Sequence, residues 1–192
     1  MNKLSFKYFT KSLIVLTILV SIISENLSAQ AKNPSPLNFP TPKNVDNMLF
    51  YIQPDPNINT AIYAINYQEN GKIDKENPIK GYWIRYAEKG EKKDFNYIQR
   101  KFAYGIESKV LNNEEFELQF VSYKKLPLTL KKIDSDQKYH VFVSVNQKKI
   151  QVEKIFVRIE GGSFWLPNVK YAEVTGIEAS SNKAITERIL LK

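Results

Sequence analysis

The residues best suited to chemistry lie in two short stretches, "GYWIRY" at 81–86 and "NYIQRKFAYG" at 96–105. Each stretch places an arginine among aromatic side chains. Arginine binds carboxylate and phosphate groups through two parallel hydrogen bonds, and its guanidinium packs favourably on an indole ring. Together these residues could line a pocket for a carboxylate, a phosphate or a sugar. The five candidate ligand-binding residues are Trp83, Arg85, Tyr97, Arg100 and Tyr104.

The same stretches have an ordinary structural interpretation. Arg85 and Arg100 could instead pair with internal acids such as Glu107 or Glu117 and hold a helix against a sheet. In a strand, Trp83 and Arg85 share one face, while Tyr82 shares the other face with its apolar neighbours. Both faces of this strand are therefore substantially apolar, and the sequence leaves the pocket and the packing interpretation open.

Catalytic residue types are scarce. His140 is the only histidine, so the chain can form neither a multi-histidine metal site nor more than one Ser-His-Asp arrangement. Cysteine is absent, which excludes disulfides, thiol catalysis and cysteine-bound zinc. The sequence also contains no G-x-S-x-G elbow, phosphate-binding glycine loop or dinucleotide fingerprint. We therefore assign no catalytic residue, metal ligand or cofactor, and expect a protein that is not an enzyme.

Acidic residues provide two weaker signals. "DPNINT" resembles the opening of a calcium loop, but Thr60 stands where that loop needs glycine and Asn66 where it needs glutamate. An ordinary turn is the better interpretation. Acid–base chemistry could come from the glutamates at 114, 115 and 117 or from the aspartates at 134 and 136, although a solvated strand end and a loop are the better interpretation of these acids.

Runs of β-branched and aromatic residues with a period of two predict a mainly β fold. About nine strands at short spacing indicate an antiparallel sandwich or barrel-like domain. The expected strand regions are 48–53, 60–68, 79–88, 114–125, 138–160 and 169–192. The last two are each expected to hold two strands joined by a turn.

One segment departs from the period of two. Phe95, Ile98 and Phe102 have the spacing of a helix stripe, with Asp94 as a candidate N-cap and Gly105 as a candidate residue just beyond the C-terminus. We predict a short helix over 95–104. A twisted strand is the alternative, because part of the segment also fits a period of two.

The N-terminal region has the pattern of an export signal. Three lysines precede the apolar run 13–23, which is within the length of a signal-peptide core and too short to span a bilayer. We predict a signal peptide over 1–29, with cleavage after Ala29 or Ala31, and an uncleaved anchor as the alternative. A proline-rich linker is expected over 30–45, followed by one β-rich domain over 46–192. The expected location is the periplasm or the exterior of the cell, with no membrane-spanning segment in the mature chain.

The chain is basic, with a formal net charge of +8, which becomes +6 without residues 1–29. Much of this charge lies in lysine pairs at expected turns. Such pairs usually protect sheet edges and keep a protein soluble, and they also attract anionic lipids and glycans. Nucleic acid is not an expected partner because no binding motif is present.

Several blocks resemble a family of exported bacterial proteins that is common in the Bacteroidota and known only as a domain of unknown function. The most specific blocks are "WIRY" and "QRKFAYG", and the resemblance covers about residues 48–190. It implies a single domain with a signal peptide, and no activity, ligand or catalytic residue follows from it.

The first functional hypothesis is therefore a non-catalytic envelope protein that binds a small anionic, glycan or lipidic ligand, or a protein partner. One alternative is a carboxylate-dependent glycan hydrolase, which needs two acids about 5–10 Å apart. Another is a structural interaction module, which would have a filled core and an exposed apolar patch or sheet edge.

Overall fold

The alternation of apolar and polar residues produces a mainly β structure, as predicted. The computed structural model describes residues 38–163 and 166–190, and every structural statement below concerns these residues. The predicted signal peptide lies outside them. Within them, one α-helix and eleven strands form: β1 (Met48–Asp55), β2 (Thr60–Ile65), β3 (Ile79–Arg85), β4 (Glu91–Asp94), α2 (Tyr97–Phe102), β5 (Ile106–Asn112), β6 (Glu115–Phe120), β7 (Tyr123–Ile133), β8 (Lys138–Val145), β9 (Lys148–Gly162), β10 (Pro167–Glu178) and β11 (Ala184–Leu190).

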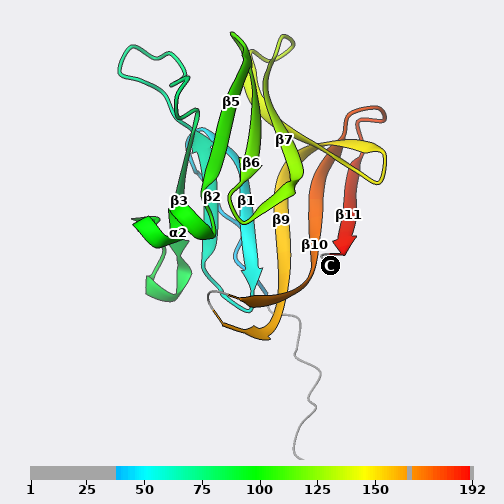
Figure 1. Ribbon diagram of the computed structural model, residues 1–192. Coiled ribbons are helices and arrows are strands. Elements are labelled where there is room, and N and C mark those ends of the chain that lie inside the picture. Colours follow the sequence, from blue (N-terminus) through cyan, green and yellow to red (C-terminus); the bar gives the residue numbers. More distant parts are fainter. Residues whose placement is uncertain (1–37, 164–165, 191–192) are drawn as a thin grey trace, which may run out of the picture. The chain divides into compact units, whose positions relative to one another are not determined.

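All described strands belong to one sheet, in which β9 is the central element (Figure 1). β10 pairs with one edge of β9 and carries β11 beyond it. The other edge of β9 pairs with β8 near its start and with β1 farther along. Two arms leave this edge, β1–β2–β3–β4 and β8–β7–β6–β5. Only the β1–β9 pair is parallel.

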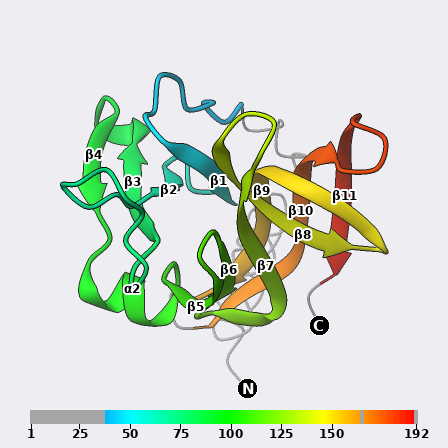
Figure 2. The ribbon, with the colours of Figure 1, turned by 90° about the horizontal axis from the view of Figure 1, so that it is seen from above.

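The sheet curls so that the inner faces of its two arms meet in the core (Figure 2). Phe50 on β1 stacks on Tyr63 of β2 at 4.7 Å between ring centroids. Both rings contact Phe120 of β6, at 6.2 and 5.8 Å respectively. This curled, half-barrel-like sheet confirms the predicted sandwich or barrel-like class.

The strand predictions fail where the sequence is polar or where a turn is short. β4 is exposed along its whole length, so no apolar alternation marks it. β5 is also almost entirely exposed. The expected strand 114–125 is two strands, because the chain reverses between Phe120 and Tyr123. Its inward positions up to Phe120 are buried as predicted.

The predicted helix exists but is shorter than 95–104, and its caps differ from those expected. Asn96 is the N-cap: its Oδ1 accepts from the Gln99 amide at 2.8 Å, and the Gln99 Oε1 accepts from the Asn96 amide at 3.0 Å. Asp94 belongs to β4 instead. Gly105 is not the residue that ends the helix, since Ala103 is the C-cap. Gly105 is needed because a Cβ there would lie 1.9 Å from the Arg100 carbonyl oxygen.

The helix stripe predicted from 95, 98 and 102 does not face the core. Phe95 is buried but precedes the helix, and Ile98 and Phe102 are 41% and 51% exposed. The helix is therefore held by its capping box and by contacts at its ends.

Both faces of the "GYWIRY" strand bury an aromatic side chain, in agreement with the apolar character of both faces in the sequence. Trp83 is buried in the main core. On the opposite face, Tyr82 packs with Ile62 and Ala64 of β2 in a second, smaller cluster. Part of the proline-rich stretch also covers the outside of the sheet: Phe39 contacts the ring of Phe156 at 5.7 Å between centroids. No helix among the described residues is long and apolar enough to cross a membrane.

Candidate functional site

Trp83 and Arg85 line one small polar pocket of about 270 Å³, beside Lys93, Asp94 and several amide side chains. The two side chains do not stack on each other. The guanidinium of Arg85 is held by Glu88 at 2.5 Å and by Glu91 at 3.2 Å. These acids replace the internal partners expected from the sequence, and ligand binding by this pocket stays a prediction.

The indole of Trp83 is held inside the fold. Its ring contacts Phe95 and Tyr104 edge-on, at 5.4 and 4.7 Å between centroids. Its Nε1 donates to the Gln99 Oε1 at 3.3 Å. Because Trp83 is only 7% exposed, little of its indole is accessible to a ligand.

Arg100 and Tyr97 lie apart from this pocket. Arg100 donates to the carbonyl oxygen of Phe95 at 2.5 Å and thereby fixes the start of the helix. Tyr97 is 64% exposed, and its hydroxyl accepts from the Nζ of Lys101 at 3.0 Å. The five predicted residues therefore do not form a single pocket.

The internal acids predicted as arginine partners have other contacts. Glu107 pairs with Lys124 at 2.6 Å, and Glu117 accepts from the amide of Gln119 at 2.9 Å. The predicted pairing of Arg85 and Arg100 with Glu107 or Glu117 is therefore wrong. Arg100 does hold the helix in place, through its bond to the carbonyl oxygen of Phe95.

Replacing Arg85 with alanine is expected to lower the free energy of unfolding by less than about 1 kcal/mol, because it removes two ion pairs at the surface. Urea denaturation followed by circular dichroism measures this change. A loss above about 2 kcal/mol would show that Arg85 has a larger structural role than its ion pairs account for.

The acids considered for catalysis are engaged in local contacts. His140 Nε2 lies 2.6 Å from the Oδ2 of Asp136. The pKa of Asp136 lies below its usual value, mainly because the backbone amide of Lys138 donates to the carboxylate and also because of the His140 bond. Glu114 pairs with Lys132 at 3.2 Å. Among the described residues, no group of three or more histidine, aspartate or glutamate side chains could hold a metal ion.

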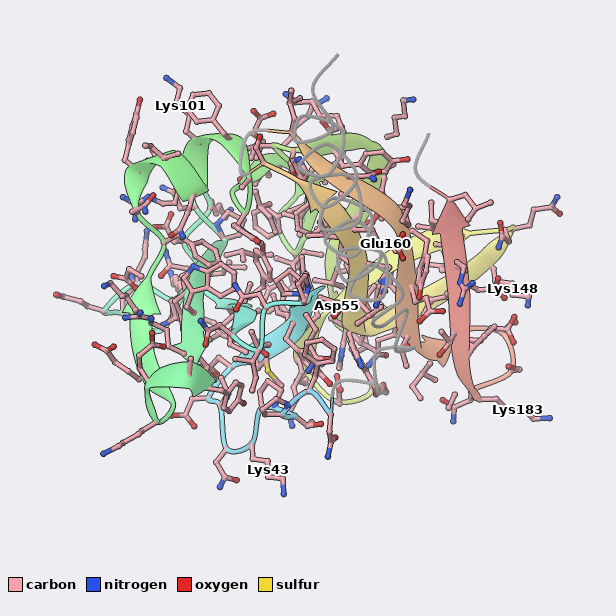
Figure 3. The ribbon with its side chains drawn as sticks, turned by 90° about the horizontal axis from the view of Figure 1, so that it is seen from below. Lys43, Asp55, Lys101, Lys148, Glu160 and Lys183 are labelled. Atoms are coloured by element: carbon pink, nitrogen blue, oxygen red, sulfur yellow. The ribbon has the colours of Figure 1, made fainter. Side chains whose placement is uncertain are left out.

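The residues of "DPNINT" are also engaged within the fold. Asp55 is buried and pairs with Arg158 at 2.5 Å. Asn57 accepts from the backbone of Asn59, and Asn59 accepts from the backbone of Ala87. Figure 3 labels Asp55, the last residue of β1, near the middle of the view from below.

The main apolar concavity lies elsewhere, between the inner face of the β1–β9–β10–β11 part of the sheet and the β6–β7 turn. It has a volume of about 580 Å³, and we call it the apolar groove. Tyr104 is the only predicted site residue that lines it. The other residues used below are Ile52, Phe120, Leu126, Ile155, Val157, Ile159, Ala172 and Ile189.

The apolar groove continues the core along β9. Ile150, Val152 and Ile155 point inward and are 0%, 2% and 4% exposed. Val157 and Ile159 continue the same inward series but are only half-buried. The apolar face of this strand therefore extends beyond the side chains that cover it, and part of its apolar surface is solvent-accessible among the described residues.

Polar groups stand at the rim of the apolar groove. Tyr104 is largely buried, and this burial raises the pKa of its phenol. Ser122 lies in the lining, and its hydroxyl donates to the carbonyl oxygen of Ala103 at 2.6 Å. Lys101 and Lys125 each directly precede a lining residue in the chain. The groove thus has apolar walls with positive charge nearby in the sequence.

The sequence signal for the apolar groove was present but incomplete. "KIFVRIE" shows the alternation that places Ile155, Val157 and Ile159 on one face. That alternation does not tell which inward-facing side chains are left without a packing partner, because the side chains that would cover them come from distant segments. The groove was therefore missed at the level of sequence.

Comparison with known proteins identifies the family of this chain. Residues 50–188 match the model of a family described as "Domain of unknown function (DUF4833)". The chain belongs to this family. No curated protein and no solved structure matches the chain. All the residues named above as lining the apolar groove, except Ile189, lie within the matched range, so the groove is part of the DUF4833 domain.

Proposed function

We propose that this DUF4833 domain is an exported, non-catalytic binding protein that holds a long apolar chain with an anionic head group in its apolar groove. The observation that carries the proposal is the groove itself, about 580 Å³ lined mainly by aliphatic and aromatic side chains. Concave, mostly apolar sites of this size with a few polar groups are typical of small-molecule binding.

The chemistry of the walls supports a chain-like apolar ligand. Burying one methylene group contributes about 0.8 kcal/mol, so a long hydrocarbon gains most from such a surface. The side chains that would contact it come from different strands: Ile52 from β1, Val157 and Ile159 from β9, and Ala172 from β10. A sugar or a free phosphate would find few hydrogen-bonding partners on these walls.

The charge of the protein supports an anionic head group. The chain carries a formal net charge of +8, which becomes +6 without residues 1–29. Lys101 and Lys125 adjoin the lining residues Phe102 and Leu126. A carboxylate or phosphate at the mouth of the groove would be attracted by this field. Export is supported by the sequence pattern of residues 1–29 and agrees with an envelope lipid or fatty acid as the ligand.

Placing a carboxylate inside the apolar groove is expected to abolish this binding. We expect Ile159→Glu to weaken the binding of palmitate by the full chain at least tenfold, because the new charge would face the apolar chain and repel its head group. Ile159 is half-buried, so the folded state should tolerate the change. Isothermal titration calorimetry with palmitate measures the affinity.

The matched control is Val110→Glu, which adds the same charge at an apolar residue of β5 that is 46% exposed and does not line the groove. It should bind palmitate like the unchanged protein. Absence of palmitate binding by the unchanged chain, or equal binding by all three proteins, would contradict the proposal.

A further inference from the structure

A second concavity lies at the opposite end of β6 from the apolar groove. It has a volume of about 870 Å³ and is bounded by the loop 66–77, the β5–β6 turn and the β7–β8 turn. We call it the polar cleft. Figure 1 shows the loop after β2 and the tip of β5 and β6 at the same end of the sheet. Glu114 of the β5–β6 turn lines the polar cleft, whereas Phe120 at the other end of β6 lines the apolar groove.

The loop that forms one wall has a defined conformation. The Oδ1 of Asp74 accepts from the backbone amides of Glu76 and Asn77, at 3.0 and 3.1 Å. Its Oδ2 accepts from the side chain of Asn66 at 3.3 Å. An antiparallel bridge joins Tyr67 to Ile73, and Ile73 is 8% exposed, which anchors the loop on the core. A wall built in this way costs little ordering entropy when a ligand binds.

Side-chain contacts fix this loop to the opposite wall. The Nζ of Lys75 donates to the Oδ1 of Asn113 at 3.1 Å. The hydroxyl of Ser108 on β5 donates to the carbonyl oxygen of Glu76 at 3.3 Å. The polar cleft is therefore a preformed feature in which three segments distant in sequence are held together.

The charges that line the polar cleft balance. Three lysines, at 72, 75 and 132, face three acids, at 74, 76 and 114. One of these pairs, Lys132 with Glu114, is a direct ion pair at 3.2 Å. A lining with no net charge favours neither an anion nor a cation, in contrast to the basic chain as a whole.

Two tyrosines provide aromatic surface in the polar cleft. Tyr67 is 42% exposed, and Tyr139 lies near it on β8. Burial, followed by the negative charge of Glu114 and a smaller electrostatic effect of Tyr67, raises the pKa of Tyr139, which agrees with the closeness of these three side chains. The negative face of an aromatic ring suits the C–H groups of a sugar ring, and the surrounding amide, ammonium and carboxylate groups can hydrogen-bond its hydroxyls.

From this combination of balanced charge, exposed tyrosine and dense hydrogen-bonding groups, we propose that the polar cleft binds a neutral oligosaccharide. The site is independent of the apolar groove and of its proposed ligand. An apolar chain would bury too many polar groups here, and an anion would gain no net attraction.

Binding of neutral hexasaccharides to the full chain tests this proposal. The probes are cellohexaose, chitohexaose, maltohexaose and mannohexaose, each titrated calorimetrically. We expect at least one to bind, and Tyr67→Ala to weaken that binding at least tenfold because the exposed ring is lost. Tyr67→Phe keeps the ring and should bind within about threefold of the unchanged chain.

The matched control is Tyr97→Ala, which removes another exposed tyrosine that does not line the polar cleft. It should leave hexasaccharide binding unchanged. Failure of all four probes to bind at up to about 10 mM would overturn the proposal. It would also be overturned if Tyr67→Ala, folded by circular dichroism, bound as well as the unchanged chain. Shortened sugars after incubation would identify the cleft as a hydrolase site and not a binding site.

Discussion

Replacing Phe50 with alanine is expected to lower the free energy of unfolding by about 3–5 kcal/mol. Phe50 has no exposed surface, and its ring lies where the two arms of the curled sheet meet. It stacks on Tyr63 and meets Phe120 edge-on, so its removal opens a cavity between two arms whose strand pairing meets only through β9. Chemical denaturation in urea measures the loss.

The comparison variant is Tyr97→Ala, which truncates an aromatic residue that is 64% exposed and is expected to cost less than about 1 kcal/mol. Equal costs at the two positions would show that the contact between the arms does not stabilise the fold as described.

Gly176→Ala is expected to destabilise the protein by about 3 kcal/mol through a collision in the backbone. Gly176 lies in β10, where a Cβ would approach the carbonyl oxygen of Gln151 to 1.9 Å. The pairing of β10 with β9 shifts register at this point. Adding a methyl group would force apart the two strands that carry the wall of the apolar groove, and thermal unfolding should detect it.

The comparison variant is Gly71→Ala, which replaces a glycine by alanine without the collision expected at Gly176. A Cβ at Gly71 would meet no atom within 4 Å, and its positive φ of 74° makes alanine strained. We expect about 1 kcal/mol of destabilisation from that strain alone. If Gly176→Ala is as stable as Gly71→Ala or more stable, the described packing of β10 against β9 is contradicted.

The fold class was predictable because burial follows local alternation. In β6, Phe116, Leu118 and Phe120 are buried in turn, as the sequence indicates. β4 was not predictable, since its four residues are all exposed and it is held by backbone pairing with β3 and by surface contacts such as Arg85 with Glu91. The position of the helix was predictable, but its caps were not. Asn96 and Asp94 are both good capping residues, and Asp94 is instead part of β4, where it pairs with β3.

The predicted site was less accessible to sequence reasoning than the fold. Trp83 and Arg85 do lie together, as neighbours on one strand must. The partners of Arg85 were mistaken because Glu88 and Glu91 come close through the 3-10 helical turn Tyr86–Glu88 and the reversal into β4. Both large concavities depend on segments that are distant in sequence, and no local pattern shows that Ile159 or Tyr67 remains partly exposed there.

The two concavities give this DUF4833 domain two surfaces of different chemistry. The apolar groove lies at one end of β6 and the polar cleft at the other. A protein with both could hold the hydrocarbon part of one molecule and the sugar part of another. The separate controls, Val110→Glu for the groove and Tyr97→Ala for the cleft, allow each surface to be tested without the other.

The central claim, that the apolar groove holds an apolar chain, is tested most directly by NMR of isoleucine methyl groups in the full chain during titration with palmitate. Ile62 packs on the outer face of the sheet, and Ile73 lines the polar cleft. The groove is lined by four isoleucines, Ile52, Ile155, Ile159 and Ile189. We predict that the methyl signals of these four residues shift, whereas those of Ile62 and Ile73 stay in place. Unchanged groove signals, or shifts confined to Ile62 and Ile73, would contradict the claim.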